Sequence, residues 1–204
     1  MFNKKENLKL SDLIDIEFLQ EFQDFFAKTM GIASIAIDEN GLVTKPSNFT
    51  DFCTNFVRNE KSSLKECDEI HSKEGKISAE IKEAVIYTCP NGLTEFAVPI
   101  LVKEQHIGTL IGGQVFLESP DEDHYRKVAT QLGIDEDKYI KALKMVKIIP
   151  IEKAKEAAHL LFLISSAISK IADEKLELLE KCERGTLYKN IVETIRNSLD
   201  SWLY

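Results

Sequence analysis

Two long runs with the composition of β-strands follow each other almost without a break, and this feature constrains the fold more than any other. Thr94–Val102 and His106–Phe116 are rich in β-branched and other apolar residues, and only Lys103, Glu104 and Gln105 separate them. Strands joined by so short a connection pair as antiparallel neighbours. The chain therefore has an antiparallel hairpin near its middle, and its helices must pack on a sheet built around that hairpin.

Three further strands are predicted on the N-terminal side of this hairpin. Ile32–Ile37 and Leu42–Thr44 flank a turn signal that ends in Gly41, and Val85–Cys89 follows a helical stretch. Pro99 within a strand favours an edge position or a bulge at that point.

The remaining segments carry helix signals such as N-cap residues, capping boxes and helical spacing of apolar residues. The predicted helices are Asp15–Met30, Asp51–Arg58, Ser63 to about Gly75 with Ile77–Glu83 as a short further piece, Pro120–Leu132 capped by Ser119, Asp135–Val146, Ile151 to about Glu183, and Thr186–Trp202 after an interruption at Gly185. The order predicts an α+β fold of PAS-like type: a five-stranded antiparallel sheet with covering helices and a C-terminal helical extension.

Composition excludes several classes of function. The 204 residues include 26 Lys and Arg against 34 Asp and Glu, a net charge of −8. An acidic chain is a poor direct binder of nucleic acid or of a membrane surface. There is no apolar run long enough to span a bilayer and no signal-peptide pattern at Met1, so we expect a cytoplasmic protein.

Catalytic motifs are not found in the sequence. It contains no glycine-rich phosphate loop, no Gly-x-Ser-x-Gly elbow and no His-Glu-x-x-His, and its four histidines are scattered. We therefore expect a binding module rather than an enzyme.

The cysteines support two interpretations. Cys53, Cys67 and Cys89 lie along the segment that joins the early strands to the hairpin, and His71 follows Cys67 by four residues on one helix face. Three thiolates and an imidazole would suit zinc or an iron–sulfur cluster. Alternatively, the thiols are soft, small groups that pack a pocket.

The Gly112-Gly113 pair in the second long strand also supports two interpretations. Simple alternation places Gln114 on the same face as Leu110, Gly112 and Phe116. Glycines leave room for a ligand, to which the Gln114 amide could hydrogen-bond. The alternative is a β-bulge in which Gln114 bonds the backbone.

An apolar stripe on the long C-terminal helix predicts a packing surface. Ala157, Leu161, Ile164, Ile168 and Ile171 recur at intervals of three and four residues. We expect a homodimer through the C-terminal helices; the alternative is that this stripe only covers the open face of the sheet.

Several short motifs together resemble the PocR sensory-domain family. They are Phe52-Cys53, Cys67-Asp68, Tyr87-Thr-Cys-Pro-Asn-Gly-Leu93, Glu95-Phe-Ala-Val-Pro-Ile100 and Gly112-Gly-Gln-Val115, and the resemblance extends over about Leu8 to Lys175. The family consists of PAS-like ligand-sensing modules of bacterial signalling proteins. The resemblance implies a sensor for a simple hydrocarbon derivative, such as a small diol or alcohol, acting in transcription regulation or a two-component system through an output domain or partner protein.

The resemblance and the apolar pattern together give a set of expected ligand-site residues. The set is Phe52, Cys53, Cys67, Tyr87, Cys89, Gly92, Leu93, Phe96, Gly112, Gln114 and Phe116. We expect a sensory domain over residues 8–150 and a helical segment for packing, dimerisation and signalling over residues 151–204. The rival functions are a metal or redox sensor built on Cys53, Cys67, His71 and Cys89, and a scaffold domain that binds no ligand.

Overall fold

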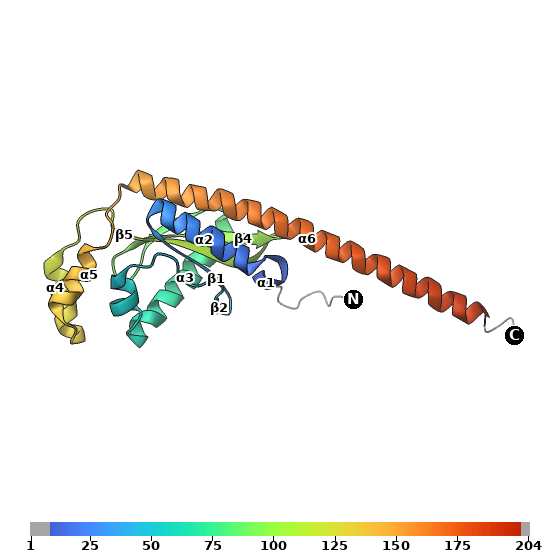
Figure 1. The fold of residues 1–204 in the computed structure, drawn as a ribbon, viewed down its shortest axis with the longest axis horizontal. Coiled ribbons are helices and arrows are strands. Elements are labelled where there is room, and N and C mark those ends of the chain that lie inside the picture. Colours follow the sequence, from blue (N-terminus) through green and yellow to red (C-terminus); the bar gives the residue numbers. More distant parts are fainter. Residues whose placement is uncertain (1–8, 201–204) are drawn as a thin grey trace.

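A five-stranded antiparallel sheet forms the centre of the molecule, in the order β2-β1-β5-β4-β3 (Figure 1). The structure is a computed structural model that describes residues 9–200. The strands are β1 (Ala33–Asp38), β2 (Gly41–Leu42), β3 (Val85–Thr88), β4 (Thr94–Val102) and β5 (Gln105–Val115). The predicted α+β, PAS-like architecture with five antiparallel strands is confirmed.

Helices precede, interrupt and follow the strands. They are α1 (Leu10–Leu13), α2 (Ile16–Met30), the π-helix η1 (Phe52–Val57), α3 (Lys61–Ile81), α4 (Glu122–Leu132), α5 (Glu136–Lys144) and α6 (Ile151–Asp200). Asp15, at the predicted start of this helix, caps α2 by accepting hydrogen bonds from the amides of Glu17 and Phe18. The sequence alone offers Ser11 and Asp12 equally as caps. Within the described residues 9–200, no helix is both long enough and apolar enough to cross a membrane.

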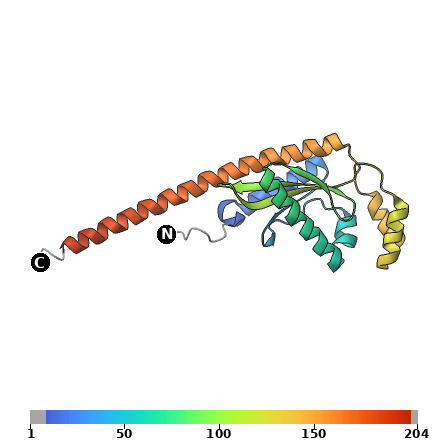
Figure 2. The ribbon, with the colours of Figure 1, turned by 180° about the vertical axis from the view of Figure 1, so that it is seen from behind.

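Different helices cover the two faces of the sheet, as Figure 2 shows with α6 on one side and α3 on the other. On the α6 face, Phe96, Val98 and Ile100 of β4 belong to a core cluster that also contains Leu19 of α2 and Leu161 of α6. On the α3 face the alternate residues of the strands form a smaller cluster of Ile35, Ile37, Ala97 and Ile111. The α3 face also holds the polar residues described below.

Two predicted boundaries of α3 are wrong. The helix begins at Lys61, before the Ser63 capping box, and it continues through Gly75 to Ile81. Gly75 lies against β5, where an added Cβ would come within 2.5 Å of the Thr109 hydroxyl oxygen. This glycine therefore allows close approach of helix and strand rather than ending the helix.

The predicted start of α4 and the predicted break in α6 are also wrong. Asp121, not Ser119, caps α4 by accepting hydrogen bonds from the amides of Asp123 and His124. A carboxylate accepts both bonds, so the helix begins at Glu122. α6 continues through Gly185 as one helix, because a single glycine costs a helix only about 1 kcal/mol.

The apolar stripe on α6 packs largely on its own sheet. Ala157, Leu161 and Ile168 are buried in the core cluster on the α6 face, whereas Ile171 is 57% exposed. Most of the stripe expected to form the dimer seam is therefore already covered within the chain. Dimerisation itself stays a prediction.

α6 also closes an open edge of β4. β3 pairs only with Thr94–Ala97, so the rest of that β4 edge has no strand neighbour. Instead, the Ser165 hydroxyl donates to the carbonyl oxygen of Pro99 (2.5 Å). The amides of Leu101 and Lys103 donate to the Ser169 hydroxyl (3.0 Å) and the Asp173 carboxylate (2.6 Å).

The spacing explains how one helix can satisfy this edge. Four residues of helix advance about 6 Å, close to the rise of about 6.6 Å for two residues of strand. Pro99 lies in this unpaired stretch, and a register shift follows between Ile100 and Leu101, as the edge-or-bulge prediction for Pro99 requires.

Candidate functional site

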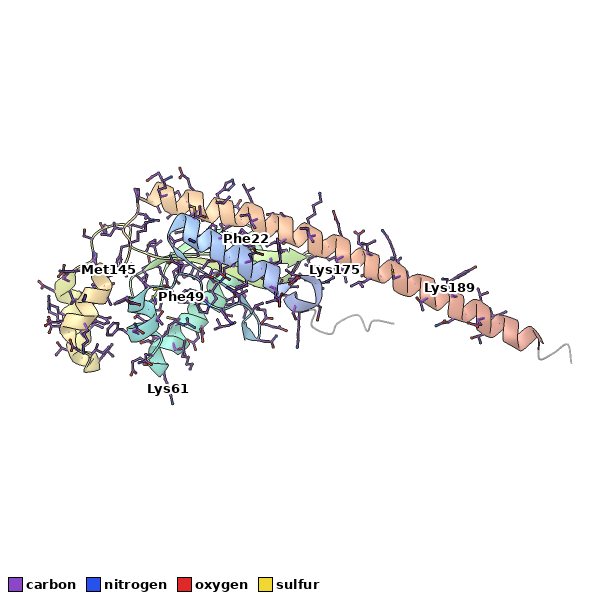
Figure 3. All side chains as sticks on the ribbon, viewed as in Figure 1. Phe22, Phe49, Lys61, Met145, Lys175 and Lys189 are labelled. Carbon is purple, nitrogen blue, oxygen red and sulfur yellow. The ribbon has the colours of Figure 1, made fainter. Side chains whose placement is uncertain are left out.

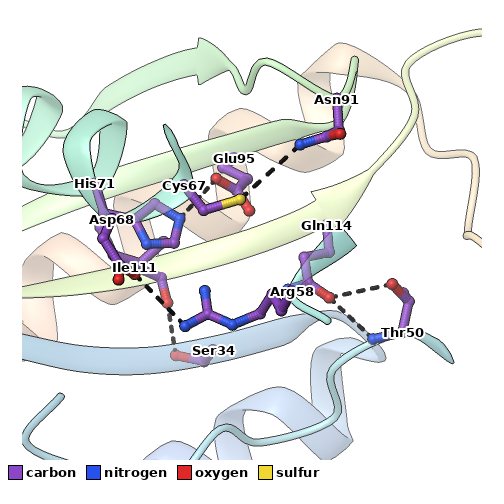
Figure 4. Close-up of polar contacts among 10 residues, drawn as sticks. All are labelled: Ser34, Thr50, Arg58, Cys67, Asp68, His71, Asn91, Glu95, Ile111 and Gln114. Atoms are coloured by element: carbon purple, nitrogen blue, oxygen red, sulfur yellow. Dashed lines mark hydrogen bonds and ion pairs between the residues drawn. The ribbon is translucent and has the colours of Figure 1, made fainter. Parts of the chain in front are cut away.

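A buried hydrogen-bonded pair of titratable side chains marks the α3 face of the sheet. The Nε2 atom of His71 on α3 lies 3.0 Å from Oε2 of Glu95 on β4, and both side chains are almost fully buried (Figure 4). Groups of this kind are costly to bury unless they are paired. An apolar pair of similar volume would often stabilise the fold at least as well, so folding stability alone does not account for this pair.

Tyr87 places a phenol next to the same carboxylate. It lies directly opposite Glu95 in the β3–β4 register, and its hydroxyl is buried without a hydrogen-bond partner among the described residues. Burial raises the pKa of Tyr87 well above its ordinary value, and the nearby Glu95 carboxylate raises it further. The hydroxyl is therefore a protonated donor that lies close to the Glu95 carboxylate but makes no hydrogen bond of normal geometry among the described residues.

Three free thiols lie in the same region. Cys53 of η1, Cys67 of α3 and Cys89 after β3 are buried and belong to one apolar cluster. Burial and the charge of Glu95 raise the pKa of Cys67 to about 11 and that of Cys89 to about 12, and burial also raises the pKa of Cys53. These thiols stay protonated near neutral pH and are weak nucleophiles.

The cysteines and histidine do not form a metal-binding group as they are placed. Across residues 9–200, no three side chains of His, Cys, Asp or Glu gather closely enough to hold an ion. His71 bonds Glu95, and the Cys67 sulfur instead lies 3.9 Å from the Asn91 amide nitrogen. A site on Cys53, Cys67, His71 and Cys89 stays a prediction.

The Gly112-Gly113-Gln114 segment forms a bulge. Thr94 pairs with Val115 and Glu95 pairs with Gly113, so Gln114 is the extra residue on β5. The predicted alternation is wrong beyond this point, because one extra residue turns Gln114 to the α3 face. There its Oε1 accepts hydrogen bonds from the Thr50 amide (2.9 Å) and hydroxyl (3.2 Å).

The two glycines make room for the protein itself. An added Cβ on Gly112 would lie 2.3 Å from the Phe96 ring, and one on Gly113 would lie 2.6 Å from the Glu95 Cα. Gly112 and Phe96 thus meet on the α6 face, away from the thiols, which matches the bulge interpretation of this motif.

Aromatic rings surround the thiols on the other side. Phe52 packs against Tyr125 of α4 and Tyr139 of α5, with ring centroids 5.9 and 5.1 Å apart, and Phe116 packs against Tyr125. The Tyr125 hydroxyl donates to the Asn91 carbonyl (2.9 Å), beside Gly92, where a side chain would clash with it. Sequence reasoning missed both tyrosines, although large rings with a polar tip on amphipathic helices are a usable signal.

The structure thus brings together most of the expected site. Eight residues lie in the thiol and aromatic cluster or at its border: Phe52, Cys53, Cys67, Cys89, Gly92, Leu93, Gln114 and Phe116. Tyr87 packs on the neighbouring α3-face cluster. Phe96 and Gly112 lie on the opposite face.

Two hollows lie elsewhere on the molecule. One, of about 270 Å³, is lined by residues that include Asp38, Lys76 and His106, and a wider one of about 690 Å³ lies along the surface of α3. Neither is lined by Cys53, Tyr87 or Glu95. The His71 and Glu95 side chains are themselves buried by the surrounding protein.

Comparison with known proteins identifies related sequences. The family described as the sensory domain found in PocR matches residues 12–173. The Regulatory protein PocR of Salmonella typhimurium (strain LT2) is 26% identical over 110 residues, which cover 53% of this chain and 36% of the relative. The aligned part is therefore little more than a third of that relative's length.

Proposed function

This chain belongs to the family described as the sensory domain found in PocR, and from this premise of a sensory module in signalling we propose that it binds a small diol or alcohol beneath α3. The observation that carries the proposal is the buried Tyr87 hydroxyl, which has no partner among the described residues although it lies beside the Glu95–His71 pair. A buried donor left without an acceptor costs about 1–3 kcal/mol, and a ligand oxygen would remove that cost.

A diol matches this arrangement chemically. Each hydroxyl group can donate one hydrogen bond and accept others. One hydroxyl would accept from Tyr87, and another would donate to the free lone pairs of Glu95. The hydrocarbon part would contact Phe52, Leu93 and the thiols, which are apolar or only weakly polar.

Binding requires the packed site to open, and η1 is the element we propose to move. Single turns of π-helix are uncommon and occur often at functional sites. η1 carries Phe52 and Cys53, and the hydrogen bonds from Thr50 to Gln114 hold its start to β5. Release of Gln114 would free an amide for a ligand hydroxyl, so Gln114 keeps its expected role as a ligand residue.

We propose a binding module rather than an enzyme. Thiols with raised pKa values are poor nucleophiles, and the imidazole of His71 is engaged by Glu95. Persistent free thiols are typical of reducing compartments, which supports a cytoplasmic setting.

The proposed output route leads through α6 to a second copy and then to an output domain or partner protein. β4 carries Glu95 on the α3 face, and its edge from Pro99 to Lys103 bonds Ser165, Ser169 and Asp173 of α6. A shift of β4 on ligand binding would therefore move α6. We propose regulation of transcription or of a two-component system as the output, and the relative named Regulatory protein PocR supports a regulatory role.

The test is calorimetry of the full chain against ethanediol, 1,2-propanediol, glycerol and 1-propanol. We expect saturable binding of at least one diol, and Tyr87→Phe should weaken that binding about tenfold or more because the ligand loses a buried donor. Tyr188→Phe, far out on α6 and 70% exposed, is the matched control and should bind as the parent does.

Two outcomes would overturn the proposal. If no member of the panel binds, the diol class is wrong, and the scaffold interpretation gains support. If Tyr87→Phe binds as tightly as the parent, the polar groups of the α3 face are not the anchor. Elemental analysis of anaerobically purified protein separates the third possibility, a metal or redox sensor, from both.

A further inference from the structure

The helical layer over the sheet has an apolar outer surface that nothing described covers. On α2, Phe18 and Phe25 are 57% and 63% exposed, and on α6 Leu160 and Ile171 are 41% and 57% exposed. Exposed phenylalanines seven residues apart occupy one side of a helix. We call these four residues, together with the half-buried Phe22 and Ile164, the α2–α6 surface.

These residues form one surface because α2 and α6 lie on the same face of the sheet. α2 contacts β1 and α6 contacts β4 and β5, and Phe22 and Ile164 both pack at the border of the same core cluster (Figure 3). The Lys175 ammonium group donates to the carbonyl oxygen of Asp12 (3.2 Å), which fixes the side of α6 that faces α1 and α2. Ile164 and Ile171 precede Lys175 by eleven and four residues, so they lie on that side too.

The same stripe continues where α6 leaves the sheet. Beyond Lys175, Leu178 is 61% exposed, and farther along Val192 and Ile195 are 45% and 54% exposed. Ile164, Ile171, Leu178 and Val192 recur at multiples of seven residues. Figures 1 and 3 show this part of α6, which carries Lys189, extending away from the rest of the chain.

The length of the stripe determines what can cover it. Leu160 to Ile195 spans about 52 Å of helix at 1.5 Å per residue. A globular partner as large as the sensory domain would cover only part of this length of α6. A second long helix can contact α6 along all of it. A lone helix in water is also only marginally stable, so the projecting part of α6 gains from a partner helix.

We propose that a second copy of this chain covers the α2–α6 surface. In this dimer the two α6 helices run parallel about a two-fold axis, and α2 of each copy packs beside them. The arrangement buries Phe18 and Phe25 in the sensory domain and Leu178 and Val192 beyond it at the same time. Ile171, Leu178 and Val192, the exposed apolar residues of α6 at intervals that are multiples of seven, then each lie opposite their own counterparts, as the symmetry of a parallel pair requires.

Analytical ultracentrifugation of the full chain at tens of micromolar tests the dimer. We expect a dimer for the parent chain, monomers for Phe25→Asp and Ile171→Asp, and a dimer for Met145→Asp. Met145 is 74% exposed just after α5, outside the proposed interface, so it controls for the general effect of an added charge on an exposed apolar site. Hydrogen exchange of the sheet amides should be unchanged in these variants, because the substituted side chains are exposed. Circular dichroism should show some loss of helix from the projecting part of α6, which then lacks its partner helix.

Two results would overturn this part of the proposal. A monomeric parent chain ends the dimer. If Ile171→Asp is monomeric while Phe25→Asp remains dimeric, α2 takes no part, and the interface is confined to α6.

Cys182, the exposed cysteine of α6, tests the direction of the helices. In the parallel pair it lies near its counterpart, and oxidation of the two thiols by copper–phenanthroline and oxygen should give a covalent dimer that Cys182→Ser abolishes. A dimer that does not cross-link would exclude the parallel arrangement. Because neither measurement involves a ligand, failure of the dimer and failure of diol binding are distinguished.

Discussion

The two faces of the sheet differ in what they bury, although neighbouring residues of β4 serve both. Phe96 points to the α6 face, into a large cluster of aliphatic and aromatic side chains from α1, α2, β4, β5 and α6. Glu95 points to the α3 face, where it bonds His71 and lies opposite Tyr87. Its charge also acts on the nearby buried thiols. Apolar burial of the first kind provides most folding free energy, whereas burial of polar groups consumes it.

We infer from this difference that the α6 face of β4 serves folding stability and that its α3 face serves sensing. The α6 face is a closely packed apolar cluster, so we expect substitutions there to lower the free energy of unfolding. The α3 face contains the buried Tyr87 hydroxyl without a hydrogen-bond partner among the described residues, a bulge and a π-helix, and we expect a ligand to rearrange these features at modest cost. Stability and sensing are therefore expected to respond to different substitutions, and the following predictions test that separation.

The largest expected effect follows Phe96→Ala on the α6 face. The ring is fully buried and fills the space that Gly112 leaves, so its removal creates a cavity and should lower the free energy of unfolding by about 3–5 kcal/mol. Urea denaturation followed by circular dichroism measures it. Leu132→Ala, at a 47% exposed position, should cost less than about 1 kcal/mol. Similar losses for the two variants would contradict the assignment of the core.

The next largest effect concerns the α3 face, where the buried thiols should make the free energy of unfolding depend on pH. Their pKa values lie above the 9.0 of an ordinary thiol, with Cys89 near 12. Above pH 9 the unfolded chain therefore releases protons that the folded chain retains, and the free energy of unfolding falls as pH rises. Between pH 8 and pH 10 the loss should be about 1 kcal/mol for each of Cys53 and Cys89.

Urea denaturation at pH 8, 9 and 10 checks this pH dependence. The double variant Cys53→Ala, Cys89→Ala should be less stable at pH 8 but should lose clearly less stability on going to pH 10. An unchanged slope in the double variant would show that these thiols do not remain protonated in the folded protein.

A smaller effect tests the connection of the two faces through the β4 edge. Ser169→Ala removes the acceptor of the Leu101 amide and should cost about 1 kcal/mol, measured as faster hydrogen exchange of that amide and a lower free energy of unfolding. Ser166→Ala is the matched control, because the Ser166 hydroxyl bonds only the Phe162 carbonyl of its own helix turn. If the Leu101 amide exchanged at the same rate in the two variants, α6 would not be the element that protects this edge of β4.

Local sequence signals predict much of the fold. The strand Thr94–Val102, the end of α2 at Met30 and the end of α4 at Leu132 follow from patterns within a few residues, and the structure confirms them. Alternation fails at Gln114, because the bulge depends on how β5 meets Thr94 and Glu95 across the sheet. Packing between the two strands sets that pairing, and the order of residues within β5 alone does not predict it.

The candidate site was less predictable for the same reason. The cysteines could be located from short motifs, but the His71–Glu95 pair joins residues that are 24 positions apart on a helix and a strand. The position of Cys67 one turn away predicts a metal-binding role for His71, and only the placement of β4 under α3 gives His71 a carboxylate partner. The stripe on α6 was equally ambiguous, since the same spacing suits a sheet and a partner helix.

The smallest predicted effect concerns Gly185, which lies on the part of α6 beyond both faces. An added Cβ would meet nothing within 4 Å, so Gly185→Ala introduces no clash. It should stabilise the projecting helix locally by up to about 1 kcal/mol, because alanine loses less backbone entropy than glycine when a helix forms. Hydrogen exchange should slow near residue 185 while the Leu101 amide and the sheet exchange as before. If the sheet amides also slowed, the projecting helix and the sensory domain would unfold as one cooperative unit. The whole of α6, and not only its packed part, would then contribute to the stability of the sheet.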